Sequence, residues 1–303
     1  MRAALLREVD GRFEVVDVTE PPADGRVVVR VRAAGVNFAD VLVRRGRYPQ
    51  MPELPTILGS EIAGELEDGT RVMAITSGGG GYAERVAVDR AQVVPLPEHA
   101  TFAEGASFLL TFLTAFIPLT RQVRVEPGKR VLVTAAAGGV GSAAIQVARG
   151  LGGAVVGVVG SPEKIETCLS LGAEAAYVYD DLPEDESFDV VLDQVGGELF
   201  PALLARLRPL GTVIAIGSAA GAWPAVEPAR IVGRNGALAG FYLGRLLRLD
   251  PELVGTAVGE LLAFWQTGAL KPFVGAELPL DEVERAHDLV ESRRSVGKVV
   301  LLP

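Results

Sequence analysis

Three closely spaced glycines could bring the backbone close to a phosphate group. Gly138, Gly139 and Gly141 follow an apolar run at residues 131–133 and precede a helical pattern. Small residues let the backbone approach a diphosphate, and the next helix offers unbonded N–H groups at the positive end of its dipole. Ala136 occupies the first position of the usual Gly-x-Gly-x-x-Gly spacing. The stretch is predicted to bind a dinucleotide. The alternative is a turn that only packs a helix on a strand.

The residues after the second predicted strand, at 154–159, favour one dinucleotide. An NAD site usually carries an acidic residue at this strand end to hold the ribose 2′-hydroxyl. Here Gly160 and Ser161 stand instead, with Lys164 three residues further on. A hydroxyl, a helix start and a cation suit a 2′-phosphate, which favours NADPH. NADH stays open because Glu163 could face the ribose. Alternatively, Ser161 only caps the helix and Lys164 is a solvated charge.

Alternating strands and helices predict the sheet that would position these residues. Strands are expected at residues 131–133, 154–159, 175–179, 188–192, 212–216 and 237–243. Helical patterns separate them, and a further helix is expected at 251–267. The βα alternation predicts a Rossmann-type, doubly wound parallel sheet, so the fold class is α/β.

The flanking regions read as a second, β-rich domain. Strands are expected at residues 2–6, 13–18, 26–36, 62–66, 71–76 and 83–88. A long helix at 101–120 follows, with Thr101 as its cap and Glu104 three residues on. The tail adds a β run at 274–280, a helix at 281–293 and a strand at 298–302. We expect a discontinuous β-rich domain, residues 1–120 and 267–303, and a dinucleotide-binding domain, residues 121–266.

The composition argues against several classes of protein. The net charge is −9, and no basic cluster suggests a nucleic acid partner. No charge-free apolar run reaches the ~18 residues of a membrane span, and the N-terminus lacks a signal peptide's apolar region, so we expect a cytoplasmic protein with no membrane partner. One cysteine, Cys168, and two histidines, His99 and His287, are too few for a disulfide or a Cys/His zinc site. Both histidines are interpreted as surface residues.

Four segments carry a resemblance to a known family. They are GVNFADVLVRRGRYP at residues 35–49, PTILGSEIAG at 55–64, AAAGGVGSAAIQVA at 135–148 and KVVLLP at 298–303. With these segments the whole chain resembles the medium-chain dehydrogenase/reductase superfamily, most closely its zinc-free quinone oxidoreductases. The resemblance implies that the β-rich domain is a GroES-like catalytic domain. Asn37 stands where zinc alcohol dehydrogenases have a cysteine, and Ser60 stands where they have a histidine. A site without a metal ion is therefore expected.

Two residues are candidate hydrogen-bond donors to the oxygen of an acceptor. They are Asn37, which the resemblance also places near the cofactor ribose, and Tyr48. Alternatively, Asn37 only caps the helix that begins near residue 40, and Tyr48 only packs on neighbouring prolines. Glu61 corresponds to an acid behind the metal ligands of the zinc enzymes and is expected to pair with an arginine. Lys298 is expected to be a surface charge.

Further cofactor-binding candidates come from strand ends and from the resemblance. Gly217 and Ser218 end the fifth predicted strand. Tyr179 could stack near the adenine or pack in the core, and Thr114 could lie near the nicotinamide or bond back to its own helix. The resemblance places residues 241–243 beside the nicotinamide. The predicted cofactor-binding set is Asn37, Thr114, Ala136, Gly138, Gly139, Val140, Gly141, Gly160, Ser161, Lys164, Tyr179, Gly217, Ser218, Phe241, Tyr242 and Leu243.

Three hypotheses about function follow. The first is an NADPH:quinone reductase that transfers reducing equivalents to a quinone without a metal ion. The second is an NADPH-dependent reductase of enones or enoyl thioesters, which also takes a small conjugated carbonyl substrate. The third is a nucleotide-binding protein without catalysis, because fold does not determine function. The resemblance also implies a homodimer, formed through the sheet edge near Phe241.

Overall fold

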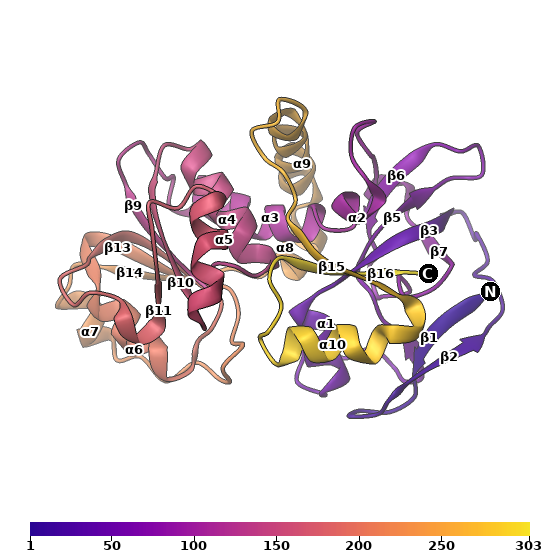
Figure 1. The fold of residues 1–303 in the computed structure, drawn as a ribbon, viewed down its shortest axis with the longest axis horizontal. Coiled ribbons are helices and arrows are strands. Elements are labelled where there is room, and N and C mark those ends of the chain that lie inside the picture. The colour runs from indigo at the N-terminus through magenta and orange to yellow at the C-terminus, as the bar shows by residue number, and fades with distance from the viewer. The chain divides into compact units, whose positions relative to one another are not determined.

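Two large sheets, each in its own compact unit, make up most of the chain. The structure is a computed structural model that describes residues 1–303. One unit comprises Met1–Leu110 and Pro272–Pro303, and the other comprises Thr111–Lys271 (Figure 1).

The second unit contains a six-stranded sheet in which every pair of neighbours is parallel. Its order is β11-β10-β9-β12-β13-β14. The order reverses between β9 and β12, which is the doubly wound arrangement that the sequence predicts, so the predicted fold class is confirmed. The strands are β9 (Arg130–Thr134), β10 (Ala154–Val159), β11 (Ala175–Val178), β12 (Phe188–Asp193), β13 (Leu207–Ala215) and β14 (Ala237–Gly240).

Four helices, α4 to α7, lie between these strands in the chain, and two more, α8 and α9, follow the last strand. They are α4 (Gly139–Gly150), α5 (Ile165–Ser170), α6 (Phe200–Ala205), α7 (Pro228–Val232), α8 (Leu243–Leu249) and α9 (Pro251–Gln266). Leu132 on the central strand β9 is fully buried, and its neighbours in one core cluster include Val156, Val191 and Phe200. Continuous apolar runs such as 131–133 form these strands because a parallel sheet is covered on both faces.

The strands of the first unit pair antiparallel, except for the parallel pair that the C-terminal segment adds, β15 and β16. A seven-stranded sheet has the order β15-β16-β3-β5-β6-β8, with β7 paired to β3, and a second sheet has the order β2-β1-β4. The strands are β1 (Arg2–Leu6), β2 (Phe13–Asp17), β3 (Val27–Val36), β4 (Thr56–Ile57), β5 (Glu61–Glu65), β6 (Arg71–Ile75), β7 (Arg85–Val88), β8 (Val93–Pro95), β15 (Val274–Pro279) and β16 (Lys298–Leu302). Its helices are α1 (Phe38–Arg44), α2 (Phe102–Gly105) and α10 (Val283–Glu291).

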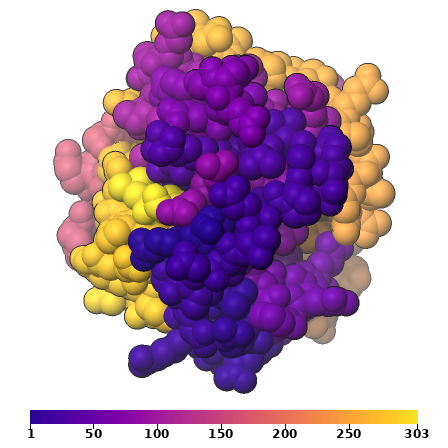
Figure 2. Space-filling view, turned by 90° about the vertical axis from the view of Figure 1, so that its right-hand side faces the viewer, coloured from indigo at the N-terminus to yellow at the C-terminus, as the bar shows by residue number.

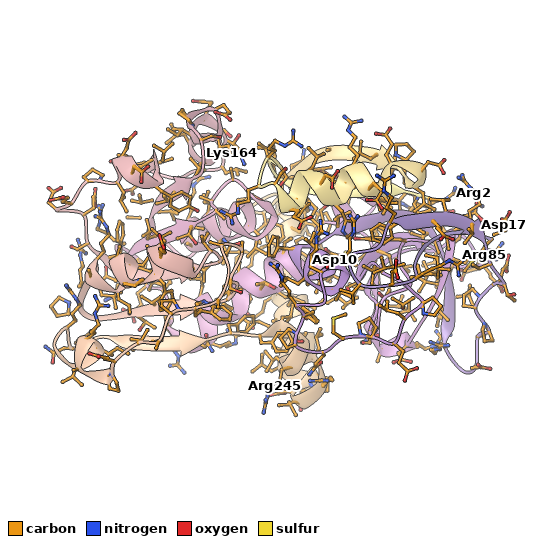
Figure 3. The ribbon with its side chains drawn as sticks, turned by 90° about the horizontal axis from the view of Figure 1, so that it is seen from below. Arg2, Asp10, Asp17, Arg85, Lys164 and Arg245 are labelled. Atoms are coloured by element: carbon orange, nitrogen blue, oxygen red, sulfur yellow. The ribbon has the colours of Figure 1, made fainter.

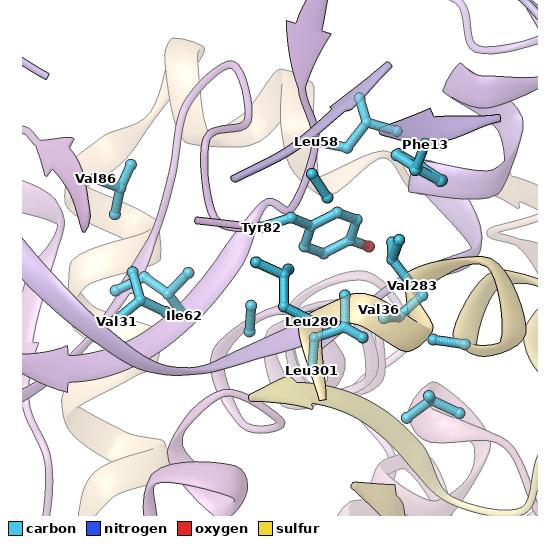
Figure 4. Close-up of a cluster of buried hydrophobic side chains, with 14 of the residues drawn as sticks. Phe13, Val31, Val36, Leu58, Ile62, Tyr82, Val86, Leu280, Val283 and Leu301 are labelled. Atoms are coloured by element: carbon cyan, nitrogen blue, oxygen red, sulfur yellow. The ribbon is translucent and has the colours of Figure 1, made fainter. Parts of the chain in front are cut away.

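The C-terminal segment returns to the strands at the start of the chain. β16 pairs antiparallel with β3, with Val300 opposite Gly35. Figure 2 shows yellow C-terminal atoms directly against indigo N-terminal atoms. The two ends of the chain are also joined by a hydrogen bond from Arg2 Nη2 to Asp281 Oδ1 at 2.5 Å. Inside, Tyr82 is fully buried among Phe13, Leu58 and other apolar side chains from both ends of the chain (Figure 4).

Two predicted elements differ in the structure. The helix expected at 101–120 is broken into α2, α3 (Leu109–Ile117) and a π-helical turn at Pro118–Gln122. It breaks because Leu110 N–H donates to the Glu61 carboxylate at 2.8 Å instead of continuing a helix from α2. The strand expected at 237–243 ends at Gly240, and α8 begins at Leu243. The run LGRLLRL repeats its leucines at helical spacing, and that signal was missed.

One apolar stretch has the length and composition of a membrane span. It covers Phe102–Gln122, and 78% of its most apolar window is buried within the protein. Such burial is typical of a core helix.

Candidate functional site

The glycine turn lies between β9 and α4 and leaves the N-terminus of that helix open. Gly138 N–H donates to Ala135 O at 2.9 Å, and Gly138 is the N-cap residue of α4. No side chain caps the helix. The N–H groups of Gly139, Val140 and Gly141 are the first of the helix and have no acceptor in a preceding turn. An anion can therefore bind there.

Close packing explains why Gly141 is a glycine. A Cβ atom at this position would lie 2.3 Å from Ala135 O and 2.7 Å from Ala136 Cα. Only glycine lets α4 begin directly against the turn. Ala136 replaces the first glycine of the motif without strain, because the residue in the left-handed region is Ala135, with φ 48°.

Asp193 is the last residue of β12 and links the carboxyl ends of the central strands beside this turn. Its carboxylate accepts hydrogen bonds from Thr134 Oγ1 at 2.9 Å, Val195 N–H at 3.1 Å and Gly196 N–H at 3.0 Å. Burial raises the pKa of Asp193, although these hydrogen bonds oppose the shift. The end of β9 is thus tied to the end of β12, where the strand order reverses. Asp193 is not among the residues predicted from the sequence. Its signal is an acid directly after a buried strand.

Ser161 and Lys164 lie on one short turn after β10, with Gly160 exposed before them. The hydroxyl of Ser161 donates to Glu163 Oε1 at 2.6 Å, which lowers the pKa of Glu163. Ser161 occupies the N-cap position of the turn, as the alternative has it, but its hydroxyl makes no capping hydrogen bond. Lys164, labelled in Figure 3, is half-buried, and burial lowers the pKa of its ammonium group. A hydroxyl, a carboxylate and an ammonium group therefore share this turn.

Tyr179 supports the glycine turn directly. It follows β11 and is half-buried against the core of the second unit. Its Oη accepts a hydrogen bond from Ala135 N–H at 3.0 Å. The sequence predicted adenine stacking or core packing for Tyr179. Neither of these included a hydrogen bond to the glycine turn.

The remaining predicted cofactor residues of this unit occupy strand ends and helices. Gly217 N–H lies 3.4 Å from Asp193 O, and Ser218 follows it. Phe241 and Leu243 are buried, and Tyr242 is the N-cap residue of α8. Thr114 is half-buried in α3. No hydrogen bond from Thr114 to its own helix is present, in contrast to Thr120, whose Oγ1 donates to Phe116 O at 2.7 Å.

In the first unit, Asn37 lies between two buried charged side chains. It is the half-buried N-cap residue of α1, and its backbone N–H donates to Asp40 Oδ2 at 2.9 Å. Lys298 Nζ donates to Asn37 Oδ1 at 2.5 Å and to Glu61 Oε2 at 2.8 Å. Lys298 is 3% exposed and Glu61 is fully buried. The residue that corresponds to a metal ligand in zinc enzymes therefore faces an ammonium group.

Asp40 is the second buried carboxylate of this cluster. Tyr82 Oη donates to Asp40 Oδ2 at 3.0 Å, and Ser60 Oγ lies 3.4 Å from Asp40 Oδ1. Burial raises the pKa of Asp40, whereas its hydrogen bonds and the Lys298 charge act in the opposite direction. Burial and the adjacent carboxylate raise the pKa of Tyr82, so its hydroxyl stays protonated.

Three expectations in this unit were wrong. Lys298 is buried and is not a surface charge, and Glu61 pairs with this lysine and not with an arginine. His287 is fully buried, with its ring centroid 4.7 Å from that of Phe13, whereas His99 is exposed. Side chains far apart in the sequence form these contacts, so local sequence could not indicate them.

Tyr48 lies in the loop between α1 and β4. It is half-buried and packs against the apolar core of the first unit. No three His, Cys, Asp or Glu side chains are grouped so that they could hold a metal ion.

Comparison with known proteins identifies the family of this chain. A zinc-binding dehydrogenase model matches residues 171–301, and an alcohol dehydrogenase GroES-like domain model matches residues 23–98. The quinone oxidoreductase-like protein 2 homolog of Nematostella vectensis is 32% identical, with 99% of this chain and 88% of that protein covered. The chain belongs to the quinone oxidoreductases of the medium-chain dehydrogenase/reductase superfamily. The predicted family is therefore confirmed, including the GroES-like fold of the β-rich region.

Solved quinone oxidoreductases have the same fold along their whole length. The enzyme from Thermus thermophilus, described alone and in complex with NADPH, is 40% identical, with a TM-score of 0.91 and all of both chains covered. The quinone oxidoreductase of Pseudomonas syringae pv. Tomato is 31% identical, with a TM-score of 0.91, covering 100% of this chain and 99% of that chain.

Proposed function

We propose that this oxidoreductase transfers reducing equivalents from NADPH to a quinone without a metal ion. The observation that carries the proposal is the open N-terminus of α4 together with Ser161 and Lys164 at the end of β10. The Thermus thermophilus relative, which forms a complex with NADPH, supports this cofactor.

The residues of the second unit fit the cofactor part by part. The N–H groups of Gly139, Val140 and Gly141 would hold the diphosphate, and the small residues Ala136 and Gly138 would let the backbone approach it. Ser161 and Lys164 would hold the 2′-phosphate, because a hydroxyl and an ammonium group suit its charge. We assign the nucleotide contacts also to Gly160, Tyr179, Gly217, Ser218, Thr114, Phe241, Tyr242 and Leu243. NADPH supplies the hydride, and the protein positions and shields it.

The first unit would bind the acceptor and stabilise the charge that forms on it. A quinone or another conjugated carbonyl gains negative charge on oxygen as it is reduced, so donors and a nearby cation stabilise it. Asn37 carries two amide donors beside the buried ammonium group of Lys298. We assign Asn37 to the acceptor oxygen and the cofactor ribose, and Tyr48 to the acceptor.

The two compact units correspond in this proposal to a catalytic and a nucleotide-binding domain. We also propose a homodimer through β14, which ends the six-stranded sheet with Leu238 exposed. A charge on such an edge opposes strand pairing between copies. Leu238→Lys is therefore expected to shift the sedimentation coefficient from dimer to monomer. A location in the cytoplasm stays a prediction.

Steady-state oxidation of NADPH, followed by its absorbance, tests the reaction. Wild-type protein is assayed with a panel of quinones and a panel of enones and enoyl thioesters, each with NADPH and with NADH. Turnover of quinones with NADPH supports the proposal. Turnover of enones alone would assign the chain to the second hypothesis, and tight NADPH binding without any turnover would assign it to the third.

A further inference from the structure

We propose that Lys298 is a positioning residue that fixes the side-chain amide of Asn37 in one orientation. The inference rests on the proposed function, in which Asn37 serves the acceptor. It extends that function to the C-terminal segment, because Lys298 is the first residue of β16.

The chemistry of Lys298 determines which end of the amide faces it. An ammonium group has three donors and no acceptor, so only the oxygen of an amide can bond to it. Lys298 Nζ contacts Asn37 Oδ1 at 2.5 Å, and therefore Asn37 Nδ2 lies on the opposite side. One Nδ2 hydrogen points toward Gly35 O at 3.3 Å, and an amide nitrogen has a second hydrogen for a ligand. Without Lys298 the amide could turn over and present its oxygen.

The space around Lys298 is shaped for this side chain. A Cβ atom on Gly35 would lie 2.8 Å from Lys298 Cε and 2.1 Å from Ala106 O. Glycine on β3 therefore leaves the room that the lysine stem occupies. Glu61 holds the ammonium group at 2.8 Å from the other side.

The backbone of Asn37 is held by the same region of the fold. Asp40 accepts a hydrogen bond from the Asn37 N–H. Two ion pairs join the C-terminal end of α1 to α10, the helix that precedes Lys298 in the chain. Arg44 Nη2 pairs with Glu284 at 2.6 Å, and Arg45 Nη2 pairs with Glu291 at 2.7 Å. The C-terminal segment thus anchors the helix that begins at Asn37 and also supplies the cation that orients its side chain.

Removing Lys298 alone would leave the buried Glu61 carboxylate without a counter-charge, which is strongly destabilising. The test therefore uses Lys298→Met combined with Glu61→Gln, because glutamine retains an oxygen for Leu110 N–H. Asn37→Ala, and a triple variant that combines it with the two other substitutions, complete the mutant cycle. Lys129→Met, at a half-exposed surface lysine, is the matched control.

Kinetics give the first readout. With NADPH and the best acceptor, we expect the Lys298/Glu61 double variant to lose about tenfold in kcat, while the NADPH dissociation constant and Tm change little. In the Asn37→Ala background the same two substitutions should change kcat by less than about twofold. An equal loss in both backgrounds, or no loss in either, would overturn the proposal.

Nuclear magnetic resonance gives a readout that needs no turnover. The sequence contains only two asparagines, Asn37 and Asn235, so 15N-asparagine labelling yields two side-chain amide groups. We expect the Asn37 pair to shift in the double variant, while the pair of exposed Asn235 stays unchanged. Unchanged Asn37 signals would refute the positioning role. A wild-type protein inactive on all acceptors would refute the proposed function and leave this measurement as the test of orientation.

Discussion

Tyr179 and Ala135 are joined across the second unit by a hydrogen bond of 3.0 Å from the Ala135 N–H to the tyrosine Oη. Ala135 is the residue of the glycine turn with a positive φ, 48°, which is unfavourable for a residue with a side chain. The tyrosine therefore supports the turn in a conformation that its own sequence does not favour.

Removal of this hydroxyl should weaken cofactor binding. We expect Tyr179→Phe to raise the NADPH dissociation constant about threefold to tenfold, because one hydrogen bond contributes about 0.5–1.5 kcal/mol. The rate at saturating NADPH should change little. Fluorescence titration measures the affinity, and Tyr177→Phe on β11 is the control because it also removes a hydroxyl from a half-buried tyrosine of this unit. An equal loss of affinity in both variants would contradict a role for the Tyr179–Ala135 contact.

A methyl group at Gly141 should damage both stability and binding. Its Cβ would lie 2.3 Å from Ala135 O, so α4 and the turn must separate. We expect Gly141→Ala to cost about 1–3 kcal/mol in the free energy of unfolding and to raise the NADPH dissociation constant at least tenfold. Gly150→Ala, at the other end of the same helix, has open space around the added atom and should not destabilise the protein. Urea unfolding and NADPH titration of both variants decide the matter.

The turn after β10 should set the choice between NADPH and NADH. Lys164→Gln removes a cation from the proposed 2′-phosphate contact, worth about 1.5–3 kcal/mol, so the ratio of kcat/KM for NADPH over NADH should fall about tenfold or more. Glu163→Gln removes the anion bonded to Ser161 and should raise the same ratio. A ratio that stays constant in both variants would show that the 2′-phosphate binds elsewhere.

Acid should destabilise the protein through His287. Burial, together with the charges of Arg44 and Arg45, lowers the pKa of His287 to about 3, from an ordinary value of 6.5. Between these two pH values the folded state binds fewer protons than the unfolded state. The contribution of neutral His287 to the free energy of unfolding is therefore complete above pH 6.5 and is lost as the pH falls toward 3. The complete loss corresponds to about 4–5 kcal/mol.

Urea unfolding at pH 7.5 and pH 5 measures this effect. We expect His287→Leu to lose less stability between the two pH values than the wild-type protein, because leucine does not titrate. His99→Leu, at an exposed position, should keep the wild-type loss. Parallel pH dependence in all three proteins would assign the acid sensitivity to other groups.

The local units of this protein follow from patterns among neighbouring residues. The strand, glycine turn and helix from Arg130 to Gly150 were predictable because apolar runs, small residues and helical spacing act over a few neighbouring residues. The capping box of Thr101 and Glu104 formed as predicted for the same reason. These local signals suffice for the alternation of strands and helices, and hence for the Rossmann-type sheet.

Which charged side chains meet depends on contacts between distant segments of the chain. Lys298 lies 261 residues from Asn37 and 237 from Glu61 in sequence, and β16 brings it to both through pairing with β3. Nothing in the residues next to Lys298 distinguishes a buried cation from a solvated one, because burial depends on which distant strands cover it. For the same reason His287 and the Tyr179–Ala135 contact were not foreseen. Short-range patterns set the elements, whereas long-range packing set the electrostatics of the site.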